Sequence, residues 1–161
     1  MSIRVAVLTI SDRSAAGDRA DDSGDVITDW VRRCSCELVH RGLVPDESDQ
    51  IARLLAQWAD EGIADLILTT GGTGLGPRDV TPEATRAAIE RETPGIAEAI
   101  RADGRSVTAR AVLSRGVAGV RAASLIVNLP GSVGGVRAGL ATLGLFLDHA
   151  VAIIRNEPTD H

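Results

Sequence analysis

The stretch ADLILTTGGTGLGPRDVTPE, residues 64–83, decides the fold of this chain. Its first seven residues are rich in apolar and β-branched side chains, which predicts a strand buried on both faces. Four glycines follow within residues 71–76, and Thr81-Pro82-Glu83 then predicts a helix start, with the Thr81 hydroxyl as cap and proline in the first turn. A buried strand, a glycine loop and a helix in this order are typical of a parallel α/β sheet.

The same alternation continues on both sides of this stretch. Further buried strands are expected at residues 3–10, 36–44 and 124–129, separated by a polar loop at 11–25 and by helices at 24–33, 49–61, 81 onward, 93–104 and about 133–155. Ser23 is the expected N-cap of the first helix, and residues 106–123 are expected to form a short helix and then an irregular or β segment. The order predicts a three-layer αβα fold with a mostly parallel sheet and helices on both faces, in a single domain of residues 1–161.

Composition excludes several classes of function. The 161 residues carry 17 basic and 22 acidic side chains, a net charge of −5, which argues against nucleic-acid and anionic-membrane partners. All basic residues are arginine, so neither a P-loop lysine nor a Schiff-base lysine is available. No apolar run reaches the length of a membrane span, and the short run at residues 5–10 does not resemble a signal peptide, so the cytoplasm is the expected compartment. Cys34 and Cys36 are interpreted as reduced thiols on opposite faces of a strand rather than zinc ligands.

Polar turns follow the four buried strands. Because ligands of parallel α/β sheets bind at the carboxyl ends of the strands, the turns at residues 11–13, 45–47, 71–79 and 130–132 are the candidate binding region. Ser11 and Asp12 end the first strand. Asn128, Pro130, Gly131 and Ser132 end the last strand and open a helix, whose N-terminus favours anions. Helix capping by Ser132 is the alternative interpretation of that turn, and both roles can hold at once.

The glycine loop has the chemistry of a phosphate cradle. Gly71, Gly72 and Gly74 free backbone N–H groups to approach an anion, and the Thr70 and Thr73 hydroxyls add donors. The loop lacks the lysine of a P-loop, and its glycines at 72, 74 and 76 do not match the G-x-G-x-x-G spacing of dinucleotide-binding folds. The alternative is a glycine-rich turn that only lets the strand and helix pack closely.

Asp79 directly follows this loop. A carboxylate beside bound phosphates requires a bridging cation, and Mg²⁺ is commonly held by one or two carboxylates together with substrate phosphates. Asp46, in the turn after the second strand, is the candidate second carboxylate, and Arg78 is a candidate bidentate phosphate ligand. The alternatives are helix capping or an Asx-turn for the two aspartates and a solvated side chain for Arg78.

These motifs together resemble the MogA/MoaB molybdopterin adenylyltransferase family, to which the G domain of gephyrin belongs. The resemblance rests on Gly-Gly-Thr-Gly followed by Arg-Asp-x-Thr-Pro at residues 71–82, Ser-Asp-Arg at 11–13, Asp-Ser-Gly at 22–24, Pro-Asp at 45–46 and Asn-Leu-Pro-Gly-Ser at 128–132. It extends in order over about residues 3–154. The run of Arg78 to Glu83 favours the adenylyltransferase branch over the looser loops of MoeA-type and CinA-type proteins.

The resemblance implies a trimeric cytoplasmic enzyme that uses Mg-ATP to adenylylate molybdopterin, releases pyrophosphate and passes its product to a MoeA-type molybdenum-insertion enzyme. It assigns Asp46 and Asp79 as the catalytic and metal-binding residues. It assigns the glycine loop to phosphate binding and residues 128–132 to the substrate cleft. Val133-Gly134-Gly135 departs from the family, where a lysine or another polar residue is common, so no cation is expected from these three positions.

Two other functions stay open at this point. The chain could be a non-catalytic protein that binds molybdopterin or acts as a scaffold, although the presence of both Asp46 and Asp79 argues against this, because a carrier has no need of a metal beside its phosphates. It could also be a doubly wound domain that binds a nicotinamide cofactor, which the glycine spacing disfavours.

Overall fold

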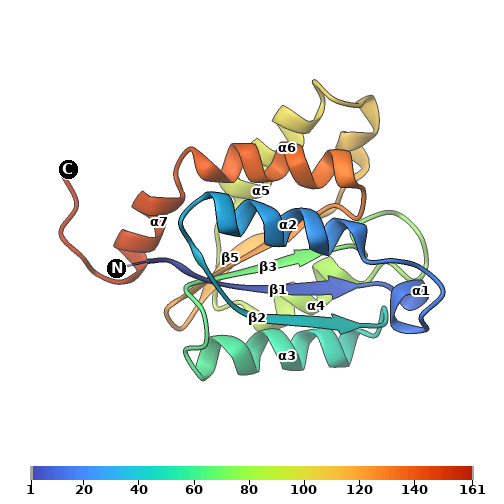
Figure 1. Cartoon of the computed structure of the whole chain (residues 1–161), viewed down its shortest axis with the longest axis horizontal. Coiled ribbons are helices and arrows are strands. Elements are labelled where there is room, and N and C mark those ends of the chain that lie inside the picture. The colour runs from blue at the N-terminus through green and yellow to red at the C-terminus, as the bar shows by residue number, and fades with distance from the viewer. Residues whose placement is uncertain (1, 161) are drawn as a thin grey trace.

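The computed structural model describes residues 2–160 of the chain, so residues 1 and 161 of the predicted domain lie outside the described residues. Its six-stranded sheet has the order β2-β1-β3-β6-β5-β4 (Figure 1). The strands are β1 (Arg4–Ile10), β2 (Glu37–Val44), β3 (Leu66–Thr70), β4 (Arg91–Glu92), β5 (Ala118–Arg121) and β6 (Ser124–Leu129). β2, β1, β3 and β6 are parallel, whereas β5 and β4 are antiparallel additions at one edge. The predicted mostly parallel α/β sheet is confirmed.

Helices cover both faces of the sheet, as Figure 1 shows. One face packs against α2 (Asp22–Arg33), α5 (Pro94–Gly104), α6 (Val133–Gly144) and α7 (Leu147–Ile154), and the other against α3 (Ser48–Asp60) and α4 (Thr81–Ala88). Alternate residues of one strand supply the two cores: Leu66 and Leu68 face the first set of helices, and Ile67 faces the second. Burial on both faces explains the nearly continuous apolar runs of β1, β3 and β6, whereas most residues of the edge strand β2 are not buried.

The register aligns the carboxyl ends of the four parallel strands. Ile10 pairs with Val44, Thr9 pairs with Thr70, and Thr70 pairs with Leu129. The turns that follow these strands therefore start at one level along one edge of the sheet. This is the arrangement that the sequence predicted for the binding region.

Several local predictions were wrong. Residues 11–25 are not one loop, because α1 (Asp12–Ala15) forms a single turn directly after β1, and Asp21 rather than Ser23 caps α2 by accepting the Gly24 N–H. Thr81 is the first residue of α4 rather than its cap, and its hydroxyl donates to the Gly71 carbonyl instead. The expected short helix and β segment at 106–123 are confirmed as the 3₁₀ helix η1 (Ala109–Leu113) and β5.

The prediction for the two cysteines was also wrong. Cys34 is the C-cap of α2, and Cys36 lies in the connection before β2. Two residues separated by one position would also share one face of a strand rather than oppose each other. Both thiols are free, as expected.

Within residues 2–160, no single helix combines the length and apolarity of a membrane span, and only the bent pair α6 and α7 passes that test together, with 63° between its halves.

Candidate active site

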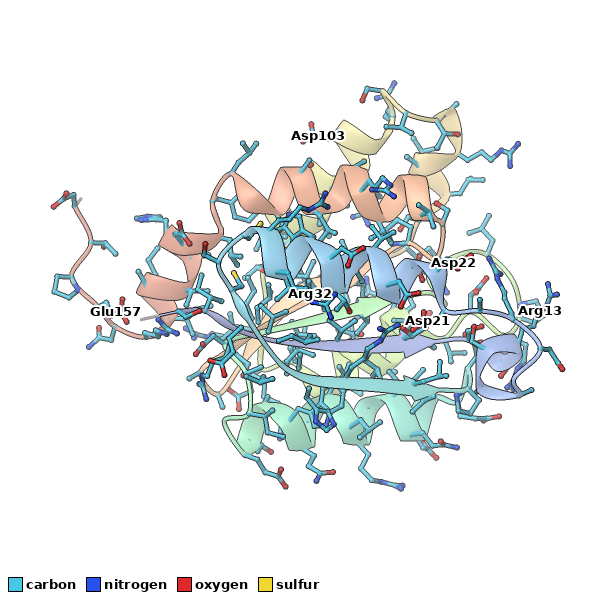
Figure 2. The ribbon with its side chains drawn as sticks, in the orientation of Figure 1. Arg13, Asp21, Asp22, Arg32, Asp103 and Glu157 are labelled. Carbon is cyan, nitrogen blue, oxygen red and sulfur yellow. The ribbon has the colours of Figure 1, made fainter. Side chains whose placement is uncertain are left out.

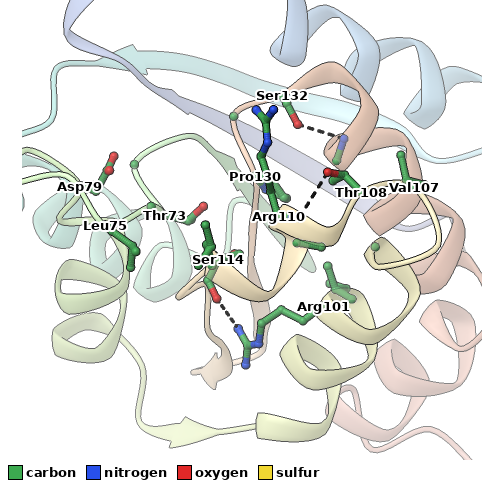
Figure 3. Close-up of a pocket in the computed structure, with 18 residues that line it drawn as sticks. Thr73, Leu75, Asp79, Arg101, Val107, Thr108, Arg110, Ser114, Pro130 and Ser132 are labelled. Carbon is green, nitrogen blue, oxygen red and sulfur yellow. Dashed lines mark hydrogen bonds between the residues drawn. The ribbon is translucent and has the colours of Figure 1, made fainter.

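Two adjoining cavities open at the carboxyl edge of the sheet. The larger, of about 560 Å³, lies between the glycine loop, the turn before α6 and the segment of α5 and η1 (Figure 3). The smaller, of about 380 Å³, lies between the turns after β1 and β2, the start of α2 and the same glycine loop. Four residues line both cavities: Gly72, Asp79, Gly131 and Ser132. The two cavities therefore meet at the glycine loop.

Close contacts explain the first two glycines of the loop. Gly71 and Gly72 have φ angles of 97° and 69°, in the region that glycine adopts without strain. A β-carbon at position 71 would lie 2.2 Å from the Ile10 carbonyl oxygen. A β-carbon at position 72 would lie 2.2 Å from the Thr81 hydroxyl oxygen and 2.9 Å from Asp46 Oδ1. These glycines bring the loop backbone against the end of β1 and against the Asp46 carboxylate.

The backbone N–H groups of the loop are available to a ligand. The Gly71 N–H donates to Leu129 O, and the Gly76 N–H donates to Asp79 Oδ2. In the described part of the chain, the N–H groups of residues 72–75 donate to no protein acceptor. Successive free N–H groups beside a cavity form an anion-binding concavity.

Asp46 reaches the site through a reciprocal pair of hydrogen bonds with Asp12. The Asp12 N–H donates to Asp46 Oδ2 and the Asp46 N–H donates to Asp12 Oδ1, each at 2.9 Å. This exchange joins the turn after β1 to the turn after β2. It leaves Asp46 Oδ1 directed toward Gly72.

Asp79 contacts the same loop farther along the chain, at Gly74 and Gly76. Its Oδ2 accepts the Gly76 N–H at 2.8 Å and would lie 2.8 Å from a β-carbon at Gly74. Asp79 lines both cavities, and Asp46 lines the smaller one. The two predicted catalytic carboxylates therefore flank one short loop.

Negative charge accumulates at this junction. Burial raises the pKa of Asp46, and the nearby Asp12 and Asp79 carboxylates raise it further. The hydrogen bond that Asp12 accepts from Arg78 lowers the pKa of Asp12. A bound cation between the loop and the two carboxylates would relieve the repulsion that Asp46 experiences.

Asp12 and Arg78, which the sequence predicts as ligand contacts, pair with each other in this structure. Arg78 donates to both oxygens of Asp12, at 3.0 and 3.1 Å, and to Glu47 Oε1 at 2.9 Å. Neither Asp12 nor Arg78 is among the residues that line the two cavities. This pair instead fixes Asp46 by tying together three turns from different parts of the sequence.

Asn128 is also absent from the cavity walls. Its side-chain amide donates to the hydroxyls of Thr69 and Thr85, both at 2.9 Å, and its oxygen accepts the Val117 N–H. The side chain is buried and uses these bonds to join β6 to β3, α4 and the residue before β5. The other predicted site residues all line at least one cavity: Ser11, Asp46, Thr70, Gly71, Gly72, Thr73, Gly74, Asp79, Pro130, Gly131 and Ser132.

Hydroxyl side chains hold the remaining turns in place. Thr70 donates to the Pro130 carbonyl at 2.6 Å, which joins the glycine loop to the turn after β6. Ser132 caps α6 by accepting the Gly135 N–H, and Ser11 caps α1 by accepting the Ser14 N–H. The interpretation of Ser132 as a helix cap is thus confirmed, and Ser132 also lines both cavities.

Sequence reasoning missed the far walls of both cavities. Figure 3 shows Thr108, the N-cap of η1, and Arg110 of η1 facing the larger cavity, with the Arg110 side chain extending toward Ser132. Arg19, Asp21 and Asp22 line the smaller cavity, and Figure 2 shows the two aspartates near the start of α2, with Arg13 on the outer side of α1. These residues lie in segments without a motif or a clear hydrophobic period, so no sequence signal marked them apart from the Asp-Ser-Gly triplet at 22–24.

The chemistry of these donors fits a metal held jointly with a substrate. Among the described residues, no group of three or more His, Cys, Asp and Glu side chains could hold a metal ion by itself. Two carboxylates beside a row of free N–H groups match the way that Mg²⁺ is bound by one or two carboxylates and substrate phosphates.

Comparisons with known proteins agree with this geometry. Residues 6–149 match the model of a family described as probable molybdopterin binding domain. The chain is 41% identical over 157 residues to the molybdenum cofactor synthesis protein cinnamon of Drosophila melanogaster, covering 97% of this chain and 26% of that protein. It is 37% identical over 155 residues to the molybdopterin adenylyltransferase of Helicobacter pylori strain J99, covering 95% of this chain and 88% of that protein.

A solved structure shows the same fold. The molybdopterin biosynthesis enzyme MoaB of Thermus thermophilus superposes with a TM-score of 0.91 at 46% identity, over 98% of this chain and 99% of that one. The chain spans only about a quarter of cinnamon, so it corresponds to one part of that longer protein.

Proposed function

This chain belongs to the probable molybdopterin binding domain family of molybdenum cofactor biosynthesis, and on that premise we propose that it is a molybdopterin adenylyltransferase that acts as one domain over residues 1–161. The reaction joins the terminal phosphate of molybdopterin to the AMP part of ATP and releases pyrophosphate. The observation that carries the proposal is the position of Asp46 and Asp79, which flank one loop of free N–H groups where two cavities meet.

Two reactant cavities suit a transfer between two anionic molecules. An oxygen of the molybdopterin phosphate attacks the α-phosphorus of ATP, the bond from that phosphorus to the bridging oxygen breaks, and pyrophosphate leaves with the electron pair. The attacking phosphate is already ionised, so the site has little proton transfer to perform. Catalysis then rests on positioning and on neutralising charge.

The chain's own residues supply the positioning. The N–H groups of residues 72–75 bind phosphate oxygens, and Gly71 and Gly72 allow the close approach of the backbone. Asp46 and Asp79 are the residues that would hold Mg²⁺, directly or through water. When bound, this ion offsets the repulsion between the two reactants. Thr73 lines the larger cavity and Ser132 lines both, so their hydroxyls add donors.

The proposed cellular context follows from the family. We expect the adenylylated product to pass to a MoeA-type insertion enzyme, and we expect a cytoplasmic homotrimer. The cinnamon protein, which is about four times the length of the match, shows that this unit also occurs within a longer cofactor-synthesis protein.

A direct assay tests the activity. The purified chain is incubated with molybdopterin and Mg-ATP, and pyrophosphate and adenylylated molybdopterin are quantified, with EDTA as one control. We expect stoichiometric formation of both products that depends on Mg²⁺. Tight binding of molybdopterin without pyrophosphate release would instead establish the carrier or scaffold function.

A variant tests the assignment of the metal site. Asp79→Ala should retain molybdopterin binding and lose about 100-fold or more in turnover, because the carboxylate acts chiefly on the reacting complex. Asp29→Ala is a matched control, since Asp29 forms an exposed ion pair with Arg32 on α2, outside both cavities. Turnover of Asp79→Ala close to that of the control would remove Asp79 from the site.

A further inference from the structure

Arg115 contacts the glycine loop more extensively than any other residue outside it. It lies in the connection between η1 and β5, far from the loop in sequence. Its N–H donates to the Thr73 carbonyl at 2.8 Å, Nε donates to the Gly74 carbonyl at 2.8 Å, and Nη2 donates to the Asp79 carbonyl at 2.7 Å. Nη1 pairs with the Glu83 carboxylate in the first turn of α4.

These bonds hold both halves of the loop from one side. Thr73 and Gly74 belong to the phosphate-binding half, whereas Asp79 and Glu83 belong to the half that leads into α4. Apart from the bonds of Arg115, the side-chain hydrogen bonds that join residues 73–79 to the rest of the described structure are those of Arg78 with Asp12 and Glu47. Arg115 therefore sets the separation of the two halves.

The geometry of the peptide unit determines the direction in which the loop N–H groups point relative to Arg115. A trans peptide unit places its carbonyl and its N–H on opposite sides. The carbonyls of Thr73 and Gly74 point to Arg115, so the N–H groups of Gly74 and Leu75 point away from it. Gly74 and Leu75 line the larger cavity and Arg115 does not, which places Arg115 behind the loop.

The positive charge of Arg115 is balanced by the Glu83 carboxylate, which does not line either cavity. The hydrogen bond to Glu83 lowers the pKa of that carboxyl and raises the pKa of Arg115, so both groups stay charged at neutral pH. A guanidinium is well suited to this place because its planar fork can bond two carbonyls and a carboxylate at once. A lysine ammonium lacks that fixed geometry.

We propose that Arg115 is a positioning residue for adenylyl transfer: by binding the carbonyls of Thr73, Gly74 and Asp79 from behind, it aims the loop N–H groups at the reacting phosphates and sets the backbone from which Asp79 acts. This inference rests on the proposed function. It adds a residue outside both cavities to the machinery that orients the reactants.

The test compares Arg115→Met with a matched arginine. Like Arg115, Arg121 lies outside both cavities, and it makes a similar set of contacts by donating to both oxygens of Asp60 and to the Ala88 carbonyl, but none of these partners belongs to the glycine loop. We expect Arg115→Met to lower kcat/KM for Mg-ATP about 100-fold, the order of loss that a misplacement of about 1 Å produces. Arg121→Met should keep kcat/KM within about twofold while losing a comparable amount in Tm.

Three further measurements separate positioning from simple stability. Arg115→Lys should recover part of the loss in kcat/KM. The affinity for Mg-pyrophosphate, measured by calorimetry, should fall in Arg115→Met and stay unchanged in Arg121→Met. Amide hydrogen exchange should accelerate at Gly76, Asp79 and Thr81, whose N–H groups bond within the loop region, only in Arg115→Met.

The outcomes are distinct from those of the proposed function. An active wild-type chain whose Arg115→Met variant keeps its kcat/KM would overturn the inference, as would equal losses in both variants. If the wild-type chain makes no adenylylated product, the proposed function fails. Hydrogen exchange then still tests whether Arg115 holds the glycine loop in place. Unchanged exchange rates at Gly76, Asp79 and Thr81 in Arg115→Met would overturn that inference.

Discussion

The two ends of the parallel strands place aspartates in opposite electrostatic environments. At the amino end, Asp65 is 4% exposed and accepts hydrogen bonds from Arg4 and Arg155. Burial alone would raise the pKa of Asp65, yet these bonds lower it to about 2. At the carboxyl end, burial and neighbouring carboxylates raise the pKa of Asp46.

The two aspartates differ in whether the protein itself supplies their counter-charges. Asp65 has its counter-charges within the protein, so its ionisation stabilises the fold. Asp46 receives one backbone N–H bond from Asp12, while Arg78 binds to Asp12 and Glu47 rather than to Asp46. A carboxylate that lacks a positively charged partner within the protein is suited to bind a cation that arrives with the substrate.

Asp46→Asn gives the largest expected effect. Turnover should fall about 1,000-fold, because an amide cannot neutralise the cation that offsets reactant repulsion. The unfolding free energy should stay equal or rise, since the variant removes a charge that the fold disfavours and keeps an oxygen to accept the Asp12 N–H. Turnover assays and urea unfolding measure the two quantities, and a clear loss of stability would contradict the contrast.

Asp65→Asn should lower the unfolding free energy and leave turnover unchanged, the reverse of Asp46→Asn. It leaves Arg4 and Arg155 without their shared carboxylate, and we expect a loss of about 3 kcal/mol in unfolding free energy, as for other broken buried ion pairs. Turnover at a temperature well below the melting transition should be retained, because Asp65 lies at the opposite edge of the sheet. Equal unfolding midpoints for variant and wild type in urea would refute the assignment.

Lowering the pH should remove the contribution of Asp65 to the unfolding free energy gradually. The folded-state pKa of Asp65, about 2, lies below its ordinary value of 3.8, so its contribution is complete above pH 4 and disappears as the pH falls through 2. The shift corresponds to about 2 kcal/mol. Unfolding free energies measured from pH 5 to pH 2 should converge for wild type and Asp65→Asn, and a constant difference across that range would argue against the ion pair as its source.

Many of the strands and the turns that follow them could be predicted because short stretches of sequence determine them. The apolar run at 64–70 and the glycines after it indicated a buried parallel strand that ends in a ligand loop, and all four candidate turns meet at one edge. Eleven of the predicted site residues line the cavities because they lie at or beyond the carboxyl ends of the parallel strands, which end together at one edge of the sheet.

The tertiary structure decided which polar side chains line the cavities and which join the surrounding turns. Asp12, Arg78 and Asn128 carry the same chemical groups as the residues that line the cavities, but their partners come from distant turns that no local pattern specifies. Arg115 lies in a segment without a motif, and only folding brings it to the loop. Local periodicity and turn chemistry determine the strands and their ends, whereas hydrogen bonds between segments far apart in sequence depend on how those ends are packed.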